Sequence, residues 1–323
     1  MLHLRVICPA EHTDDVLGVL AAEPGATHVV VLRGAAIDPA GDVVQADVAR
    51  EAANEVIDAL EALDIQHTGA ITLGPVETVL STAARKAEKA APGDPADSVV
   101  WEELVSRTRE ESTLNGTFLA FLTIACLLAS VGVVTDSPIT IVGAMVVGPE
   151  FGPLAALAVA LARRKPGLAR RSLFALLLGF PFAMAATLVA TLVMERIGWM
   201  TLDSLDAQDQ VDYIYKVGPL SLVVAVLAGA AGMLALVSAK SAALVGVFIS
   251  VTTVPAAGFA VVAVTVGEWR IAALSALQLG INMVGIVVAG VLVLALRLRA
   301  GNGADRLLAE ARKDRVHQVR RLR

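Results

Sequence analysis

The second half of the chain is dominated by apolar runs that are long enough to cross a lipid bilayer. A spanning helix needs about 20 such residues. Six segments qualify: 114–134, 139–162, 172–194, 220–237, 242–266 and 272–296. With 56% hydrophobic residues and a mean hydropathy of +0.70, the 323-residue chain is too apolar for a soluble protein of its size. We therefore predict an α-helical polytopic membrane protein whose six transmembrane helices occupy residues 113–298.

The charges between these segments predict how the chain is oriented. The loop 163–171 carries five positive charges, and residues 297–323 hold nine Lys/Arg against three Asp/Glu. The segment 195–216 has five acidic and two basic residues. Because basic loops stay in the cytoplasm, we expect a multi-pass protein of the cell (inner) membrane with both termini and the basic tail 299–323 cytoplasmic. A re-entrant loop at 139–162 would reverse this pattern, so we prefer a broken helix that spans.

Residues 1–75 are predicted to form a small cytoplasmic α+β domain. Strands are expected at 2–8, 26–34, 43–49 and 65–74, and helices at 11–23 and 50–63. This βαββαβ order is that of a ferredoxin-like domain, and it resembles small ligand-binding or dimerising domains of the ACT type. Residues 1–98 contain 16 Asp/Glu and 6 Lys/Arg, a balance that argues against a nucleic-acid partner.

Residues 76–112 are expected to be a helical connector. A polar helix is predicted at 77–90, a breaker-rich linker at 91–97 and an amphipathic helix at 98–112. The last helix has two interpretations that the sequence does not separate. It is either an interfacial or oligomer-forming helix, in keeping with an expected homo-oligomer, or a connector packed on its neighbour.

The segment VGAMVVGPEFGP, residues 142–153, is apolar but interrupts its own helix. Pro149 and Pro153 each remove a backbone donor and clash with the preceding turn. We expect two half-helices that meet near the bilayer midplane, with Pro153 at the first position of the second. Broken backbone is tolerated at that depth only where protein buries it or water reaches it.

Glu150 lies at this break, between Gly148 and Gly152. A charged side chain at the bilayer centre costs roughly 2.5–3.5 kcal/mol on insertion scales, and such residues usually mark function. We therefore predict that Glu150 is linked to an ion or a substrate. The alternative is that Glu150 only caps the second half-helix and shapes the break.

The two halves of the membrane region align at an offset of 103 residues, which places 142–161 on 245–264 and Ser172 on Ser275. Three spans per half is an odd number, so the halves (about 113–195 and 217–298) would form an inverted repeat with a broken second helix in each. The second break, SVTTVPAAG at 250–258, supplies hydroxyl groups and freed carbonyls that suit a cation or a small polar solute.

The last span adds two amides, Gln278 and Asn282, which are four residues apart and therefore on one helix face. Hydrogen bonding between helices is the other interpretation of this pair. The predicted substrate or ion site thus consists of Glu150, Gly148, Gly152, Ser250, Thr252, Thr253, Gln278 and Asn282, with helix breaks at Pro149, Pro153 and Pro255.

The sequence contains no pattern typical of an enzyme. His3, His12, His28 and His67 lack metal-ligand spacing, no glycine-rich phosphate loop follows a strand, and no Ser/His arrangement is visible. We therefore expect no catalytic residue, no metal and no cofactor.

The segment VGAMVVGPEFGPLAALAVAL (142–161) follows one apolar span and precedes RRKPGLARRS (163–172). With this arrangement, the chain over about 110–297 resembles the uncharacterised hydrophobic membrane proteins of domain of unknown function 389. The resemblance rests on Gly143, Ala144 and Met145 followed by the Gly/Pro-rich break. It implies a membrane location and no particular activity. The leading functional prediction is a transporter or channel-like permease for a small solute or ion. The alternative is a membrane-anchored sensor or scaffold whose N-terminal domain binds a ligand or drives oligomerisation.

Overall fold

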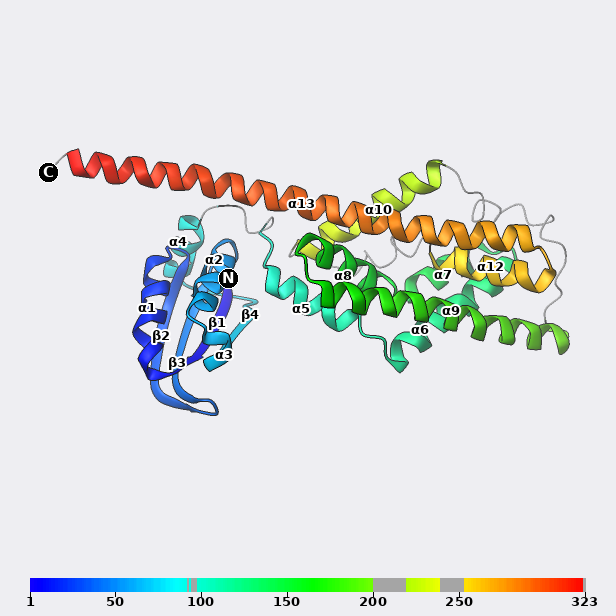
Figure 1. Ribbon diagram of the computed structural model, residues 1–323, viewed down its shortest axis with the longest axis horizontal. Coiled ribbons are helices and arrows are strands. Elements are labelled where there is room, and N and C mark those ends of the chain that lie inside the picture. The colour runs from blue at the N-terminus through cyan, green and yellow to red at the C-terminus, as the bar shows by residue number, and fades with distance from the viewer. Residues whose placement is uncertain (92, 94–97, 200–218, 239–252, 322–323) are drawn as a thin grey trace. The chain divides into compact units, whose positions relative to one another are not determined.

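The computed structural model describes residues 1–91, 93, 98–199, 219–238 and 253–321, with side chains up to Arg297 except that of Pro219 (Figure 1). The chain divides into two compact units, each described by itself below. The first contains Met1–Glu103 together with Arg297–Arg323, and the second contains Leu104–Leu296.

The N-terminal unit contains a four-stranded antiparallel sheet with the order β2-β3-β1-β4 (Figure 1). Its strands are β1 (Leu2–Cys8), β2 (Ala26–Ile37), β3 (Ala40–Val48) and β4 (Ala70–Pro75), and its two main helices are α1 (Thr13–Ala22) and α2 (Ala53–Ala62). Alternate residues of β1 and β3 are buried against apolar residues of the two helices. The prediction of a small separate domain with an antiparallel sheet is confirmed.

A buried carboxylate ties the β2–β3 hairpin to α1. Asp42 accepts a hydrogen bond from the Gly34 N–H (2.7 Å) and another from the Thr13 hydroxyl (2.8 Å). Gly34 has a φ of +62°, a conformation that glycine adopts without steric cost. The Gly34 bond, followed by the Thr13 bond, holds the pKa of Asp42 below its ordinary value.

Two predicted boundaries in this unit are wrong. The strand expected at 65–74 begins only at Ala70, because Ile65–Thr68 forms the short helix α3. Asp64 takes a left-handed conformation (φ 61°) that turns the chain, and the Ile65 side chain is then fully buried. The polar helix expected at 77–90 begins later, as α4 (Thr82–Ala90), because the Ser81 side chain caps it by accepting the Ala84 N–H.

Asn54 fixes the start of α5 (Trp101–Glu111), the last helix of the connector. The Asn54 amide donates to the Val99 carbonyl (2.7 Å) and accepts the Trp101 N–H (3.1 Å). On the predicted apolar side of α5, Trp101, Leu104 and Thr108 are buried. This burial favours the interpretation of residues 98–112 as a packed connector.

The second unit is helical. Its elements are α6 (Gly116–Val134), α7 (Pro138–Val147), α8 (Phe151–Ala162), α9 (Pro166–Arg196), α10 (Pro219–Val237), α12 (Val254–Val266) and α13 (Trp269–Arg321), which continues beyond the unit. Four of the described helices (α6, α9, α10 and α13) are long and apolar enough to cross a membrane, and α7 with α8 makes a fifth if this bent pair is one span. The remaining predicted span, 242–266, is described only from residue 253 onward. A multi-pass membrane protein is confirmed at this level.

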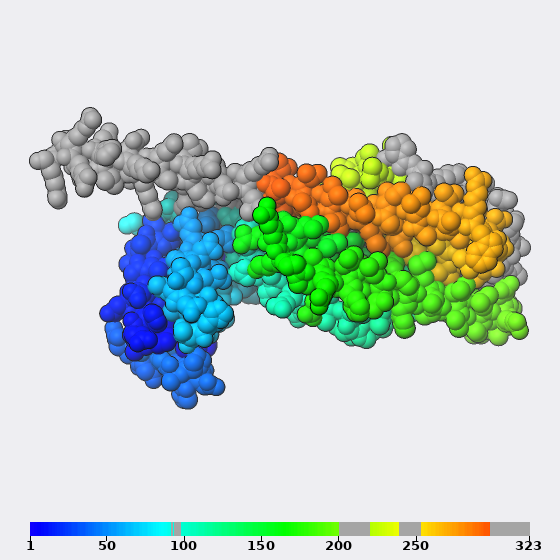
Figure 2. Space-filling view, viewed as in Figure 1, coloured from blue at the N-terminus to red at the C-terminus, as the bar shows by residue number. Residues whose placement is uncertain are grey.

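The visible face of the second unit is formed largely by α9 (green) and α13 (orange) in Figure 2. Large apolar side chains of both helices are exposed, among them Leu177 (62%), Phe182 (54%) and Val284 (64%). A soluble protein rarely leaves so many large apolar groups in water, so these faces suit contact with lipid.

Candidate functional site

The predicted helix break lies between Val147, where α7 ends, and Phe151, where α8 begins. The two helices are bent by 54° relative to each other. Gly148 follows the last residue of α7, and Pro149 lies in the connection. There its missing N–H and its ring do not disturb a helix. Pro153 is the third residue of α8, whereas we expected it at the first position. The N–H groups of the first four helical residues have no partner within the helix, so a proline there removes no hydrogen bond.

Glu150 occupies the position before the first residue of α8, and its side chain is fully buried. The carboxylate makes no side-chain hydrogen bond to its own helix. Instead, Oε1 accepts a hydrogen bond from the Thr253 hydroxyl at 2.7 Å. This geometry gives no support to the interpretation that Glu150 is merely a cap for α8.

Thr253 holds the same position in front of α12 and is also fully buried. Pro255 is in the first turn of α12, and every residue from Val254 to Ala263 is buried. The contact between Glu150 and Thr253 therefore joins the N-terminal ends of α8 and α12, two largely buried helices of 12 and 13 residues. Since each helix N-terminus carries a partial positive charge, the carboxylate lies where two positive ends meet.

Neighbouring helices leave little space around this junction. A Cβ atom on Gly258 of α12 would lie 2.5 Å from the Ala129 Cβ and 3.0 Å from the Ser130 nitrogen of α6. The buried Cys126 of α6 follows Ala125, which packs with Ala129 and with Val254 at the start of α12. A Cβ on Gly152 would lie 2.9 Å from the Glu111 carbonyl oxygen at the end of α5. Helices α6 and α5 thus pack directly against the two half-helices that bear the site.

The other predicted site residues on described helices form a second polar group. Gln278 and Asn282 are both buried, and the Gln278 amide donates to Asn282 Oδ1 at 3.3 Å. The Ser221 hydroxyl of α10 donates to the same oxygen at 3.4 Å. This bond agrees with the interpretation of the two amides as links between helices. Ser250 and Thr252 lie outside the described residues, so their predicted roles are untested.

The offset of 103 residues found between the two stretches of sequence also separates elements of the structure. The starts of α12 and α13 lie 103 residues after those of α8 and α9, the same separation as that between Glu150 and Thr253. A contact between helices recurs as well. The Phe118 ring packs on Gly179 between α6 and α9, and Ser221 bonds Asn282 at the corresponding positions of α10 and α13.

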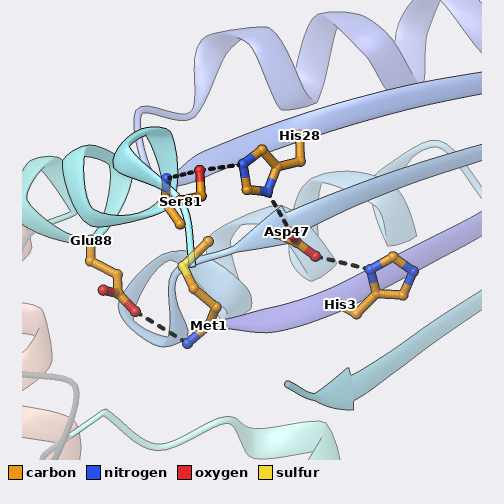
Figure 3. Close-up of polar contacts among 7 residues, drawn as sticks. Met1, His3, His28, Asp47, Ser81 and Glu88 are labelled. Atoms are coloured by element: carbon orange, nitrogen blue, oxygen red, sulfur yellow. Dashed lines mark hydrogen bonds and ion pairs between the residues drawn. The ribbon is translucent and has the colours of Figure 1, made fainter. Parts of the chain in front are cut away.

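Sequence reasoning missed a polar cluster in the N-terminal unit (Figure 3). Asp47 bonds two histidines, His3 through Oδ1 (2.9 Å) and His28 through Oδ2 (2.7 Å). The other ring nitrogen of His28 is 2.7 Å from the Ser81 hydroxyl. Although burial raises the pKa of Asp47, the bonds to His28 and His3 outweigh this effect and hold it below its ordinary value.

This chain of contacts has the connectivity of a Ser-His-Asp arrangement. However, the Ser81 oxygen already accepts the Ala84 N–H as the cap of α4, and the His28 side chain is 37% exposed. A salt bridge between the N-terminal amine and Glu88 (3.3 Å) fastens the same helix. The cluster therefore holds α4 against the sheet. The residues are far apart in the sequence, which gave no local signal of the contact.

Comparison with known protein families bears on the membrane unit. Residues 145–288 match the family described as Domain of unknown function (DUF389). The match covers 144 of the 323 residues, and over this range the chain is similar to that family. The match begins in α7 and ends in α13, so it includes Glu150, Thr253, Gln278 and Asn282. No curated protein and no solved structure matches the chain. The resemblance that the sequence suggested is confirmed over this range, and the match brings no activity with it.

Proposed function

We propose that this protein is a transporter or channel-like permease for a small solute or ion, with its site where α8 and α12 meet. One observation carries the proposal: a fully buried carboxylate, Glu150, bonded to Thr253 between two half-helix N-termini. Among the described residues of the membrane unit, Glu150 is the one charged side chain that is buried. A charge in such a place is expensive, and transport sites are a common reason for keeping it.

The proposed architecture is six transmembrane helices in two inverted three-helix repeats, each with a broken second helix. The shared offset of 103 residues in helix starts and in one contact between helices supports this repeat. In such folds the substrate site lies at the interface between the repeats, beside the broken helices. The Glu150–Thr253 contact has that location in the proposed repeat.

The proposed orientation places both termini in the cytoplasm. Single cysteines can test it in a chain whose two native cysteines have been replaced. Gly167→Cys and Asn302→Cys should react with an impermeant thiol reagent only from the cytoplasmic side. Asp206→Cys, outside the described residues, should react only from the external side. External labelling at Gly167 would contradict the six-span proposal, because the basic loop fixes the direction of the second span.

Transport itself is tested with the full chain in liposomes. Flux of monovalent cations, halides, phosphate and small metabolites would be measured with and without a pH gradient. If Glu150 exchanges a proton during transport, Glu150→Gln should change the flux and its pH dependence, because it removes the titratable charge at nearly constant volume. Glu268→Gln, at an exposed position before α13, is the matched control. A Glu150→Gln protein with the wild-type pH profile would remove Glu150 from the mechanism.

A second proposal is a membrane-anchored sensor or scaffold. It is supported by the separate N-terminal unit, whose strand order fits the ferredoxin-like assignment. Its partners would be a metabolite or a second copy of the chain, beside the lipid bilayer, and no nucleic acid. Light scattering of the detergent-solubilised chain and thermal shifts across a metabolite panel test this proposal. A monomer with no ligand-induced shift would count against it.

A further inference from the structure

We propose that the last turn of α5 closes one approach to Glu150 and that displacing this turn opens the site to water. The inference rests on the proposed function, since it concerns access to the same site. It assigns to the connector a role as a gate for the membrane unit. Residues Leu104–Glu111 of α5 belong to the same compact unit as the half-helices, so the contacts below lie within one unit.

The closing contact is between Glu111 and the first turn of α8. A Cβ atom built on Gly152 would lie 2.7 Å from the Glu111 Cβ, 2.9 Å from its carbonyl oxygen and 3.2 Å from its carbonyl carbon. The backbone of α5 therefore rests on α8 two residues beyond Glu150. Only a residue without a side chain allows this approach, so Gly152 sets how closely the cover fits.

Two polar side chains at the C-terminal end of the cover are bonded to the backbone of their own segment. The Thr108 hydroxyl donates a hydrogen bond to the Leu104 carbonyl (2.7 Å). The hydroxyl of Ser112, just after α5, donates to the Arg109 carbonyl (3.1 Å). Its outer side is polar and exposed, where Arg107 pairs with Glu111 at 3.3 Å. An exposed pair of this kind contributes little to stability.

One bond anchors the chain just after the cover. Arg171 at the start of α9 donates to the Thr113 hydroxyl at 2.6 Å, on an exposed surface. The other end of α5 is held by Asn54 in the N-terminal unit. Helix α5 thus begins in one unit and ends against the site-bearing helix of the other. Because α5 is one continuous helix, a movement of its first turn would also move its last turn.

Cys126 is a native reporter for access to this region. Its thiol is fully buried, and its neighbour Ala125 packs with Val254, the residue that follows Thr253. The chain has two cysteines, and the other, Cys8, is buried in the N-terminal sheet, where burial raises the pKa of its thiol. Cys8→Ser therefore leaves Cys126 as the lone thiol of an otherwise intact protein.

The experiment measures the rate at which 2-aminoethyl methanethiosulfonate modifies Cys126 in the full-length Cys8→Ser protein, by intact mass. Gly152→Ala introduces a Cβ that collides with the Glu111 backbone, so the labelling rate should rise about tenfold or more. Gly143→Ala is the matched control, because its Cβ would meet nothing within 4 Å, and its rate should equal that of the parent. A folded Gly152→Ala protein labelled at the parent rate would overturn the proposal.

A second variant covers the case in which Gly152→Ala does not fold. Thr113→Val, also in the Cys8→Ser protein, removes the exposed bond from Arg171 that anchors the chain just after the cover, and it adds no atom at the contact with α8. Cys126 labelling should then be faster than in the parent. A folded Thr113→Val protein labelled at the parent rate would overturn the gate. Flux is measured separately. A labelling difference without any flux would contradict the proposed permease and support the gate. Flux without a labelling difference would contradict the gate alone.

Discussion

The hydrogen bond between Thr253 and Glu150 makes a quantitative prediction that does not depend on knowing the substrate. Thr253→Val removes the hydroxyl and keeps the shape of the side chain. Glu150→Gln removes the charge and keeps an acceptor oxygen. The two substitutions and their combination form a double-mutant cycle, whose coupling energy reports this one contact.

The size of the coupling follows from the geometry of the contact. The bond is 2.7 Å long, and both side chains are fully buried. A hydrogen bond to a charged group contributes about 1.5–3 kcal/mol, and one between neutral groups about 0.5–1.5 kcal/mol. If Glu150 is ionised, Thr253→Val should therefore cost about 2–3 kcal/mol in the wild-type background and about 1 kcal/mol when Gln replaces Glu150. The expected coupling is about 1–2 kcal/mol.

Reversible unfolding in mixed micelles, with increasing SDS, measures each free energy of unfolding. Thr265→Val provides the matched control within α12, since the Thr265 hydroxyl bonds the carbonyl of Val262 in its own helix (2.6 Å). Combined with Glu150→Gln, it should be additive to within about 0.3–0.5 kcal/mol. A coupling for the Thr253 pair no larger than this would refute the reasoning that the buried carboxylate depends on Thr253.

Three further predictions test the packing and the N-terminal unit. Gly258→Ala should lower the free energy of unfolding by about 1–3 kcal/mol because its Cβ would collide with the backbone of α6, whereas Gly280→Ala, with open space at its Cβ, should leave it unchanged; SDS unfolding compares the two. Asn54→Ala leaves the Val99 carbonyl and the Trp101 N–H without their partner and should cost about 1–3 kcal/mol, seen as a lower melting temperature of the full chain. Because the pKa of Asp42 is held below its unfolded value of about 3.9, its stabilising effect is complete above that pH and is lost as the pH falls further. Asp42→Asn should therefore flatten the fall in melting temperature between about pH 4 and pH 2, and an unchanged acid profile would show that another group controls it.

The parts of the fold that could be predicted are those set by local periodicity. Strand β1 occupies residues 2–8 as expected, because Leu2, Leu4 and Val6 alternate with polar residues along one face of the sheet. Helix α6 agrees with its apolar run because length and composition alone make it a spanning candidate. The start of β4 was misjudged because Ile65 has an apolar side chain that suits a strand or a helix. Burial behind the left-handed Asp64 decided for the helix, and such tertiary effects override propensity.

The candidate site was predictable in part for the same reason. Proline and glycine placed the first break at residues 148–150, and the offset of 103 aligned the segment of Glu150 with that of Thr253 before their contact was known. The sequence did not reveal that Asn282, which Gln278 also bonds, accepts a hydrogen bond from Ser221, since that contact depends on how α10 and α13 are rotated. The Asp47 cluster was missed because His28 and Ser81 are 53 residues apart and share no motif.

The difference between the two halves at their point of contact has a physical reason within the proposed repeat. Glu150 and Thr253 are equivalent positions, and they touch. If both were glutamates, two buried carboxylates would face each other, and like charges this close cannot both be ionised. A carboxylate opposite a hydroxyl avoids that repulsion and gives the charge a donor. The same compensation occurs away from the site, where a phenylalanine on a glycine corresponds to a serine bonded to an asparagine. Within the proposed repeat, the halves can thus keep a common arrangement of helices while their sequences diverge, and the divergence leaves a single acidic group at the contact, on which the proposed transport depends.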